Sequence, residues 1–130
     1  MPDPLPVRLR FLLLAVLTMA VGLWVHRGGG TSPAVRDVLG DALWAMMIAW
    51  GMGTLAPGLS PGRRAVLALA VCAAVELSQL LHSPWLDAVR RTAAGRLVLG
   101  SDFDGRDLLA YAVGVGVAWG LERTLRSGRR

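Results

Sequence analysis

Four long apolar segments constrain the fold of this 130-residue chain more than any other feature of its sequence. They cover residues 9–25, 36–55, 64–82 and 105–122, and each can form a helix of about 25 to 30 Å at a rise of roughly 1.5 Å per residue. The hydrocarbon core of a bilayer is about 30 Å thick. With 54% hydrophobic residues and a mean hydropathy of +0.50, the sequence predicts an all-α, four-transmembrane-helix bundle that forms a single integral membrane domain over residues 1–130.

The first segment has an alternative interpretation, because a basic start, a leucine-rich middle and a polar break also describe a secretory signal peptide. Arg8 and Arg10 precede or open the apolar run, and His26 and Arg27 follow it. However, no small-x-small cleavage site precedes this break, and further membrane segments come after it. We therefore expect a retained helix, the first of the bundle.

The basic residues are distributed as in a membrane protein rather than a nucleic-acid-binding protein. All 14 are arginine, nine residues are acidic, and the formal net charge is +5. The arginines stand in small groups between apolar runs, where transmembrane helices end, so no nucleic-acid partner is predicted. Arginine without lysine, beside frequent Ala, Gly, Leu and Val, indicates a bacterial source. The single Cys72 lies in an apolar run, which predicts a packing role and neither a disulfide framework nor a metal site. No cofactor is predicted.

The distribution of arginines also predicts the orientation of the helices. With four spans, both chain ends and the turn at Arg63 and Arg64 lie on one side, which carries eight arginines against six on the other. By the positive-inside rule, the N- and C-termini are predicted to be cytoplasmic, in a multi-pass protein of the bacterial cell membrane. The acidic residues are distributed more unevenly. Two lie toward the cytoplasmic side and seven toward the outer side, the seven being Asp37, Asp41, Glu76, Asp87, Asp102, Asp104 and Asp107.

A short helix is predicted between the third and fourth segments. Ser83 followed by Pro84 is typical of an N-cap and a first helical position, and the pattern from Trp85 to residue 94 is amphipathic. A helix over residues 84–94 is too short to span a bilayer, so we expect it to lie in the membrane interface. Within the fourth segment, Gly116 and Gly120 form a small-xxx-small pair that lets another helix approach closely.

Ionisable and polar residues inside or beside the apolar segments mark the candidate site. Glu76 lies five residues before Leu81, about 8 Å inside the third segment at roughly 1.5 Å per residue, so it should face the bundle or a wet cavity. Asp37 and Asp41 share one helix face. Asp37 is expected to lie at the start of a helix, where the helix dipole favours a negative charge. The role of Asp41, a turn deeper, is open. The candidate binding residues are Asp37, Asp41, Glu76, Gln79, His82, Trp85, Asp87, Arg90, Asp104, Asp107 and Tyr111.

Three interpretations of these residues are open at the level of sequence. The acids could pair with neighbouring arginines and hold the helices together, since lipid provides no hydrophobic drive between helices. They could instead form an acidic pocket that binds a polar headgroup or another envelope ligand at the extracytoplasmic side, with arginines for phosphate and carboxylates for hydroxyls or amines. The third interpretation is a membrane-embedded hydrolase or transferase, with Glu76, Asp41 and Asp107 as candidate catalytic residues. No nucleophile motif specifies that chemistry, and no acid in the cytoplasmic half extends the group into an ion path.

The order of these motifs resembles known families of small membrane proteins. An intramembrane Glu76 with Gln79, an arginine-bearing loop, and then Asp104 and Asp107 opening a glycine-containing helix resemble the VanZ-like proteins. A closer resemblance is to a family of short bacterial membrane proteins labelled as a domain of unknown function, and it covers almost the whole chain. The segments that carry it are VHRGGG at 25–30, VRDVLGDALWA at 35–45, ELSQLLHSPWLDAVRRT at 76–92 and GRLVLGSDFDGRDLLAY at 95–111.

The resemblance implies a fold and a site location but no defined activity. VanZ-like proteins are associated with tolerance of a glycopeptide antibiotic, and the closer family has no assigned activity. Tyr111 stands where VanZ-like proteins usually carry Asn, one turn after the helix-opening Asp. The expected partners are therefore membrane lipids together with a lipid-linked or glycopeptide envelope ligand.

Overall fold

The computed structural model describes residues 4–27, 32–99 and 105–127, which form six α-helices and their connections. These helices are α1 (Pro4–His26), α2 (Pro33–Leu55), α3 (Pro61–Ser78), α4 (Pro84–Arg90), α5 (Ala93–Leu99) and α6 (Gly105–Ser127). Four are long, with 23 residues in α1, α2 and α6 and 18 in α3, whereas α4 and α5 have seven each. The predicted all-α class is confirmed for these residues.

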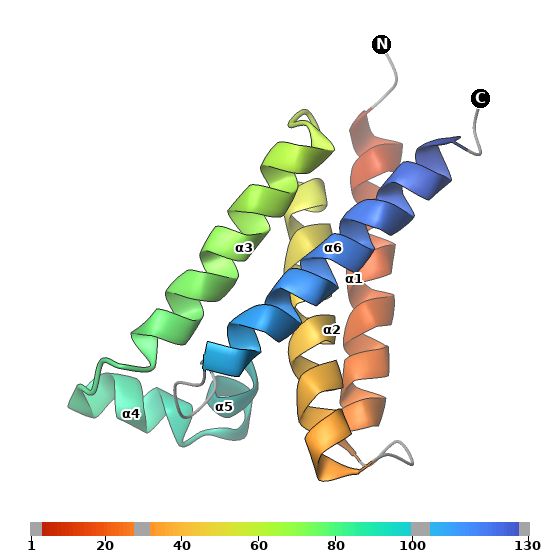
Figure 1. The fold of residues 1–130 in the computed structure, drawn as a ribbon. Coiled ribbons are helices and arrows are strands. Elements are labelled where there is room, and N and C mark those ends of the chain that lie inside the picture. The colour runs from red at the N-terminus through yellow and green to blue at the C-terminus, as the bar shows by residue number, and fades with distance from the viewer. Residues whose placement is uncertain (1–3, 28–31, 100–104, 128–130) are drawn as a thin grey trace.

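The four long helices pack together, and the two short ones lie across one end of the group (Figure 1). α1 and α2 run antiparallel, α6 crosses α2, and α3 contacts both α2 and α6. The starts of α1 and α3 and the end of α6 lie together at the top of Figure 1, around Arg64 and Glu122, and we call this the terminal end. The end of α1, the starts of α2 and α6, and both short helices lie at the bottom, around Asp41 and Asp107, and we call this the cluster end.

Three of the helices begin with the same Ser-Pro device. Ser32, Ser60 and Ser83 are extended N-cap residues, and each is followed by a proline that opens the helix. Each serine hydroxyl accepts a hydrogen bond of 3.4 Å from the backbone N–H three residues later. Proline suits the first helical position because its missing N–H would have no intrahelical partner there. These short signals explain why α2, α3 and α4 begin where they do.

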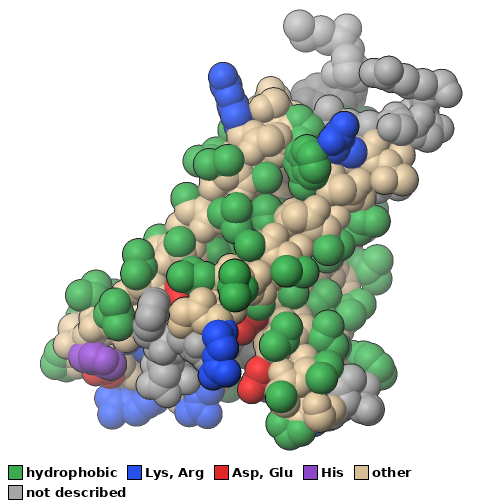
Figure 2. Space-filling model, viewed as in Figure 1, with side chains coloured by type: hydrophobic (Ala, Val, Ile, Leu, Met, Phe, Trp, Pro, Cys, Tyr) green, Lys and Arg blue, Asp and Glu red, His purple; other side chains and the backbone are tan. Residues whose placement is uncertain are grey.

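The outer surface of the helix group is largely apolar, while its interior mixes apolar and polar side chains. Phe11, Trp50 and Val115 are buried, and so are several polar or charged side chains of the described residues: Thr18, Arg64, Glu76, Gln79, Arg90 and Glu122. Large apolar side chains are exposed, among them Leu17 at 61%, Leu55 at 72%, Val66 at 66% and Leu109 at 70%. Hydrophobic side chains accordingly cover much of the surface in Figure 2. So many large apolar side chains on the outside are unusual for a protein that folds alone in water.

Two of the helices meet the length and composition required for a membrane span. These are α1, over Pro6–His26, and α2, over Pro33–Leu55. They are held together by a buried hydrogen bond of 3.1 Å, in which the Trp50 indole N–H donates to the Thr18 hydroxyl. Thr18 in turn donates to the Leu14 carbonyl at 2.7 Å, so both polar groups are satisfied within the helix pair.

Two glycines allow close contact between the helices. A Cβ atom on Gly114 of α6 would lie 2.1 Å from the Ala42 carbonyl oxygen of α2, and one on Gly53 would lie 2.6 Å from the Phe11 ring. The expected small-residue contact at Gly116 and Gly120 is not made within the described residues, because a Cβ at either position would meet nothing within 4 Å. The residue that brings α6 against α2 is therefore Gly114, on the opposite side of α6 from Gly116.

Several predicted helix boundaries differ from the structure: α1, α2 and α3 begin earlier than expected, at Pro4, Pro33 and Pro61, and α6 extends to Ser127. The third segment was expected to continue to residue 82, but α3 ends at Ser78, and the backbone N–H groups of Gln79, Leu80 and Leu81 form turn-like bonds to carbonyls three residues earlier. The helix expected over 84–94 is instead two helices, α4 and α5, separated at Arg91 and Thr92. The Thr92 hydroxyl accepts a hydrogen bond from the Gly95 N–H at 2.9 Å and so begins the second of them.

Candidate functional site

Four side chains from three helices meet at the cluster end. They are Asp41 of α2, Glu76 of α3, and Asp107 and Tyr111 of α6, and we call them the carboxylate cluster. Glu76 has no exposed surface, and its Oε2 accepts a hydrogen bond of 2.7 Å from the Tyr111 hydroxyl. The carboxyl groups of Asp41 and Asp107 are in hydrogen-bonding contact, and both residues are half-buried. Figure 2 shows acidic side chains between the helices at this end.

The close crossing of α2 and α6 positions the cluster. Gly114 lies against the carbonyl of Ala42, one residue after Asp41, so the two helix backbones nearly touch beside the carboxylates. Tyr111 is one turn from Gly114 on the same face, and its ring packs against Trp44 of α2 with 5.5 Å between centroids. This aromatic contact holds the tyrosine hydroxyl in place to donate to Glu76.

The chemistry of the cluster is that of a hydrogen-bond acceptor. Asp41 and Asp107 form a pair whose carboxyl groups are in hydrogen-bonding contact. Glu76 lies behind this pair and interacts electrostatically with Asp41. The half-buried oxygens of Asp41 and Asp107 are therefore suited to groups that donate, such as hydroxyls or an ammonium. Among the residues that the structure describes, no group of three or more His, Cys, Asp and Glu side chains has an arrangement that could hold a metal ion.

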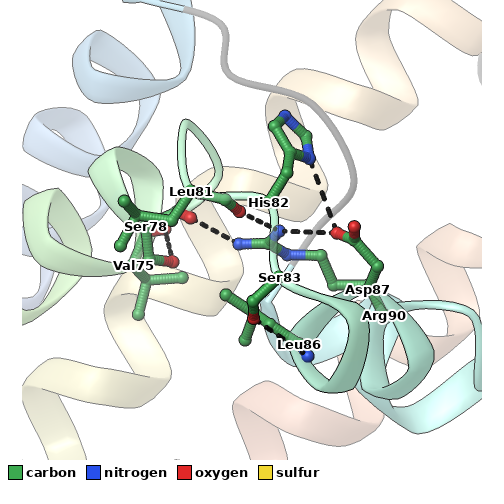
Figure 3. Close-up of polar contacts among 8 residues, drawn as sticks. All are labelled: Val75, Ser78, Leu81, His82, Ser83, Leu86, Asp87 and Arg90. Atoms are coloured by element: carbon green, nitrogen blue, oxygen red, sulfur yellow. Dashed lines mark hydrogen bonds and ion pairs between the residues drawn. The ribbon is translucent and has the colours of Figure 1, made fainter.

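Arg90 binds groups within the protein, whereas the loop arginines were expected to bind phosphate. Its Nη2 donates to the Ser78 carbonyl at 2.5 Å and its Nη1 to the Leu81 carbonyl at 2.8 Å (Figure 3). Its Nη1 also lies 3.4 Å from the Asp87 carboxylate. Arg90 is only 6% exposed, and it satisfies carbonyls at the C-terminal end of α3 that have no intrahelical partner. The arginine therefore fastens α4 beneath α3.

The remaining predicted site residues lie around the cluster rather than in it. His82 and Trp85 are exposed at the turn into α4, and the His82 Nδ1 lies 3.5 Å from the Asp87 carboxylate (Figure 3). Gln79 is buried one turn beyond Glu76. Asp37 is exposed one turn before Asp41. Asp104 lies outside the described residues, as does Asp102. No ligand contact tests any of these residues, and their binding roles stay predictions.

A second buried polar contact, at the terminal end, was not predicted from the sequence. Arg64 of α3 forms an ion pair with Glu122 of α6, and these side chains are 3% and 12% exposed. The Arg64 Nε also donates to the Leu59 carbonyl at 3.2 Å, and its guanidinium lies 4.8 Å from the centre of the Phe11 ring. Both charged residues were assigned only to helix ends facing the cytoplasm. This contact ties α3 to α6 and α1.

A regular spacing could have revealed this ion pair. The buried side chains of α3 recur every four residues, at Arg64, Ala68, Cys72 and Glu76, and those of α6 recur at Tyr111, Val115, Ala118 and Glu122. When the two helices run antiparallel and Glu76 lies beside Tyr111, the same spacing places Arg64 beside Glu122. Both polar contacts are present, so they support one register of α3 against α6 from its two ends.

Comparison with known families gives one match. The model of the family described as "Protein of unknown function (DUF2809)" matches residues 31–115. The matched region contains all four residues of the carboxylate cluster as well as Arg64 and Gly114, whereas Glu122 lies beyond it. No solved structure matches this chain.

Proposed function

The chain belongs to the DUF2809 family of proteins of unknown function, and we propose that it is a four-span membrane protein that binds a polar headgroup or envelope ligand at its carboxylate cluster. The single observation that carries this proposal is the convergence of three carboxyl groups inside an apolar-surfaced helix group. Carboxylates at such positions are costly in a membrane and usually serve a function.

The burial of charge in α3 and α6 supports four spans rather than two. The charged residues that interrupt the apolar composition of these helices are largely turned inward: Arg64, Glu76 and Glu122 are buried, and Asp107 is half-buried. What α3 and α6 present to their surroundings includes Leu77 at 54%, Leu109 at 70% and Val113 at 60% exposure. Lipid would therefore contact mainly apolar side chains on all four long helices.

Tryptophans support the same placement, because they are enriched at both surfaces of a bilayer. Trp24 and Trp85 are 63% and 70% exposed at the cluster end. At the terminal end, Trp119 is 39% exposed, and the Arg123 guanidinium lies 4.7 Å from the centre of its ring. In this placement α4 and α5 lie in the outer interface and the termini are cytoplasmic. The arginine distribution gives the orientation, and the domain is then the whole chain, residues 1–130.

The chemistry of the ligand follows from the groups that are accessible. Asp41 and Asp107 supply half-buried carboxyl oxygens, and the buried Glu76 lies behind them. Arg90 is engaged by carbonyls of α3 and by Asp87. The favoured ligand group is therefore a hydroxyl or ammonium donor rather than a phosphate held by Arg90. A sugar or amine headgroup on a lipid has this chemistry.

Removal of the accessible carboxylates tests this proposal. We expect the Asp41→Asn/Asp107→Asn variant, purified in mild detergent, to retain about a hundredfold less of the lipid species that is enriched with the wild-type chain, because each of the two charge-assisted hydrogen bonds contributes roughly 1.5 kcal/mol or more. The measurement is mass spectrometry of co-purified lipid, normalised to protein. Arg63→Gln is the control, since it removes an exposed charge at the terminal end, away from the cluster. Equal lipid profiles for all three proteins would exclude ligand binding at the cluster.

The hydrogen-bonding contact between Asp41 and Asp107 also favours a second candidate function, a membrane-embedded hydrolase or transferase. One carboxyl of such a pair can donate a proton while the other accepts one, as general acid and base. The same double variant separates the two functions. A binding protein loses its lipid, whereas a blocked enzyme accumulates an uncleaved lipid-linked substrate.

We also propose that the family is related to the VanZ-like proteins. The support is the shared order of Glu76 and Gln79, an arginine-bearing loop, and Asp104 and Asp107 at the start of the last helix. The relation bears on envelope ligands as a class. It does not extend to the antibiotic phenotype, because Tyr111 replaces the usual Asn and is engaged with Glu76.

A further inference from the structure

The cluster end separates its charges by sign. In the described part of the chain, its acids are mostly enclosed: Glu76 is buried, Asp41 and Asp107 are half-buried, and Asp87 is engaged by Arg90. The exposed charges at this end are mainly arginines, namely Arg27, Arg91, Arg96 and Arg106, with Asp37 as the exposed acid. A count of residues along the sequence makes this side of the protein acidic, but the exposed charges of its described residues are mainly basic, although the Asp87 side chain is 40% exposed. Figure 2 shows basic side chains along the lower edge, below α4 and α5.

The exposed arginines stand beside exposed tryptophans on two flanks of the helix group. Arg27 follows Trp24 at the end of α1, and Arg91 and Arg96 accompany Trp85 on the segment formed by α4 and α5. Trp85 and Val89, one turn apart on α4, are exposed, and so is Leu81 at 64%, which follows α3. Exposed apolar side chains therefore occur on α3, in the turn after it and on α4, next in sequence to Arg91.

This basic, tryptophan-bearing surface is held rigidly. Arg90 joins α4 to the carbonyls of Ser78 and Leu81 and is buried between them (Figure 3). The neighbouring Arg91 points outward. Adjacent arginines therefore have different roles, one fastening the short helix and the other presented at its surface. A fixed position for α4 fixes the depth of Trp85 relative to α3.

We propose that Arg91, Arg96 and Trp85, with Arg27 and Trp24 on the opposite flank, form a rim that binds the phosphates of anionic phospholipids in the outer leaflet. This inference rests on the membrane placement proposed above, and it is independent of what the carboxylate cluster binds. Guanidinium groups hold phosphate oxygens through paired hydrogen bonds, and tryptophan lies at the depth of the headgroups. A bilayer fits this surface. Its acyl chains would contact the exposed apolar side chains of α3, and its phosphates would contact the arginines near α4 and α5.

The test uses the full chain in nanodiscs of phosphatidylcholine with a minor fraction of phosphatidylglycerol. Wild-type protein ejected from these discs should carry phosphatidylglycerol in excess of its share of the bilayer. Arg91→Gln/Arg96→Gln should reduce that excess by about 25-fold, since each arginine near a membrane surface contributes about fivefold in affinity for anionic lipid. Native mass spectrometry counts the lipids retained on each protein.

The control is Arg63→Gln, which removes an exposed arginine at the terminal end of α3. It should leave most of the phosphatidylglycerol signal unchanged, and Trp85→Leu should weaken it less than the loss of both arginines. An unchanged excess in Arg91→Gln/Arg96→Gln, or an equal loss in Arg63→Gln, would overturn the proposal. So would a dimer that disappears in Trp85→Leu, because a second copy of the chain would then cover this surface. Loss of the cluster's lipid in Asp41→Asn/Asp107→Asn leaves these outcomes unaffected, so the two proposals can fail separately.

Discussion

Replacement of Arg64 by leucine should lower the free energy of unfolding by about 3 to 5 kcal/mol, which is the usual cost of leaving one partner of a buried ion pair without its counter-charge. The variant strands Glu122, whose side chain is only 12% exposed, and it also removes the contact of the guanidinium with Phe11. The measurement is the unfolding transition of the purified protein in mixed detergent micelles, followed by far-UV circular dichroism.

Two further variants show whether the ion pair is responsible for this loss. Arg63→Leu changes the preceding arginine, which is exposed, and it should shift the transition by less than about 0.5 kcal/mol. The charge-reversed double variant Arg64→Glu/Glu122→Arg restores opposite charges and should recover part of the lost stability. If Arg64→Leu unfolded no more readily than Arg63→Leu, the ion pair would not hold α3 to α6.

Replacement of Gly114 by valine should destabilise the protein by about 3 kcal/mol or more and disrupt the carboxylate cluster. A Cβ atom at this position would lie 2.1 Å from the Ala42 carbonyl oxygen, which is backbone and cannot rotate away. The helices must therefore separate to relieve this clash. Overpacking usually costs about 1 to 3 kcal/mol and occasionally more. Because Asp41 adjoins Ala42, separation of α2 from α6 also pulls Asp41 away from Asp107.

The matched control for this variant is Gly116→Val, two residues along the same helix. A Cβ at Gly116 would meet nothing within 4 Å, so this substitution should leave the unfolding transition within about 0.5 kcal/mol of wild type. Both variants are measured by the same detergent unfolding, and co-purified lipid reports separately on the cluster. A Gly116→Val variant as unstable as Gly114→Val would mean that α6 packs through its other face.

Helix content and the type of each long element follow from the sequence by simple physical rules. Apolar runs of helical length predicted α1, α2, α3 and α6, and the Ser83–Pro84 pair predicted the start of α4, because the serine caps and the proline fits the first turn. The same device begins α2 and α3 three residues before the expected starts at 36 and 64. The end of α3 could not be predicted in this way, since residues 79–82 continue the mixed pattern. It ends early because Arg90, twelve residues beyond Ser78, supplies donors for its last carbonyls.

The sequence analysis grouped Asp41, Glu76 and Asp107, and the structure brings them together, but the contacts within the group were not predicted. An acid at Glu76 inside an apolar run is visible in the sequence, and so are the helical spacings of Asp107 and Tyr111. That the Tyr111 hydroxyl bonds Glu76 depends on how α6 packs against α2 and α3, where Gly114 lies against Ala42. Crossing geometry is a property of packing between helices that lie far apart in sequence, and periodicity within one helix does not contain it.

Four spans would place the carboxylate cluster at the outer face of a membrane. Labelling of single introduced cysteines in intact cells by a membrane-impermeant maleimide tests this placement, because the native Cys72 is fully buried. Ser60, at the start of α3, and Ala93, at the start of α5, are both exposed and lie at opposite ends of α3. The four-span account predicts labelling of Ala93→Cys and none of Ser60→Cys until the cells are lysed. Labelling of Ser60→Cys from outside would contradict it.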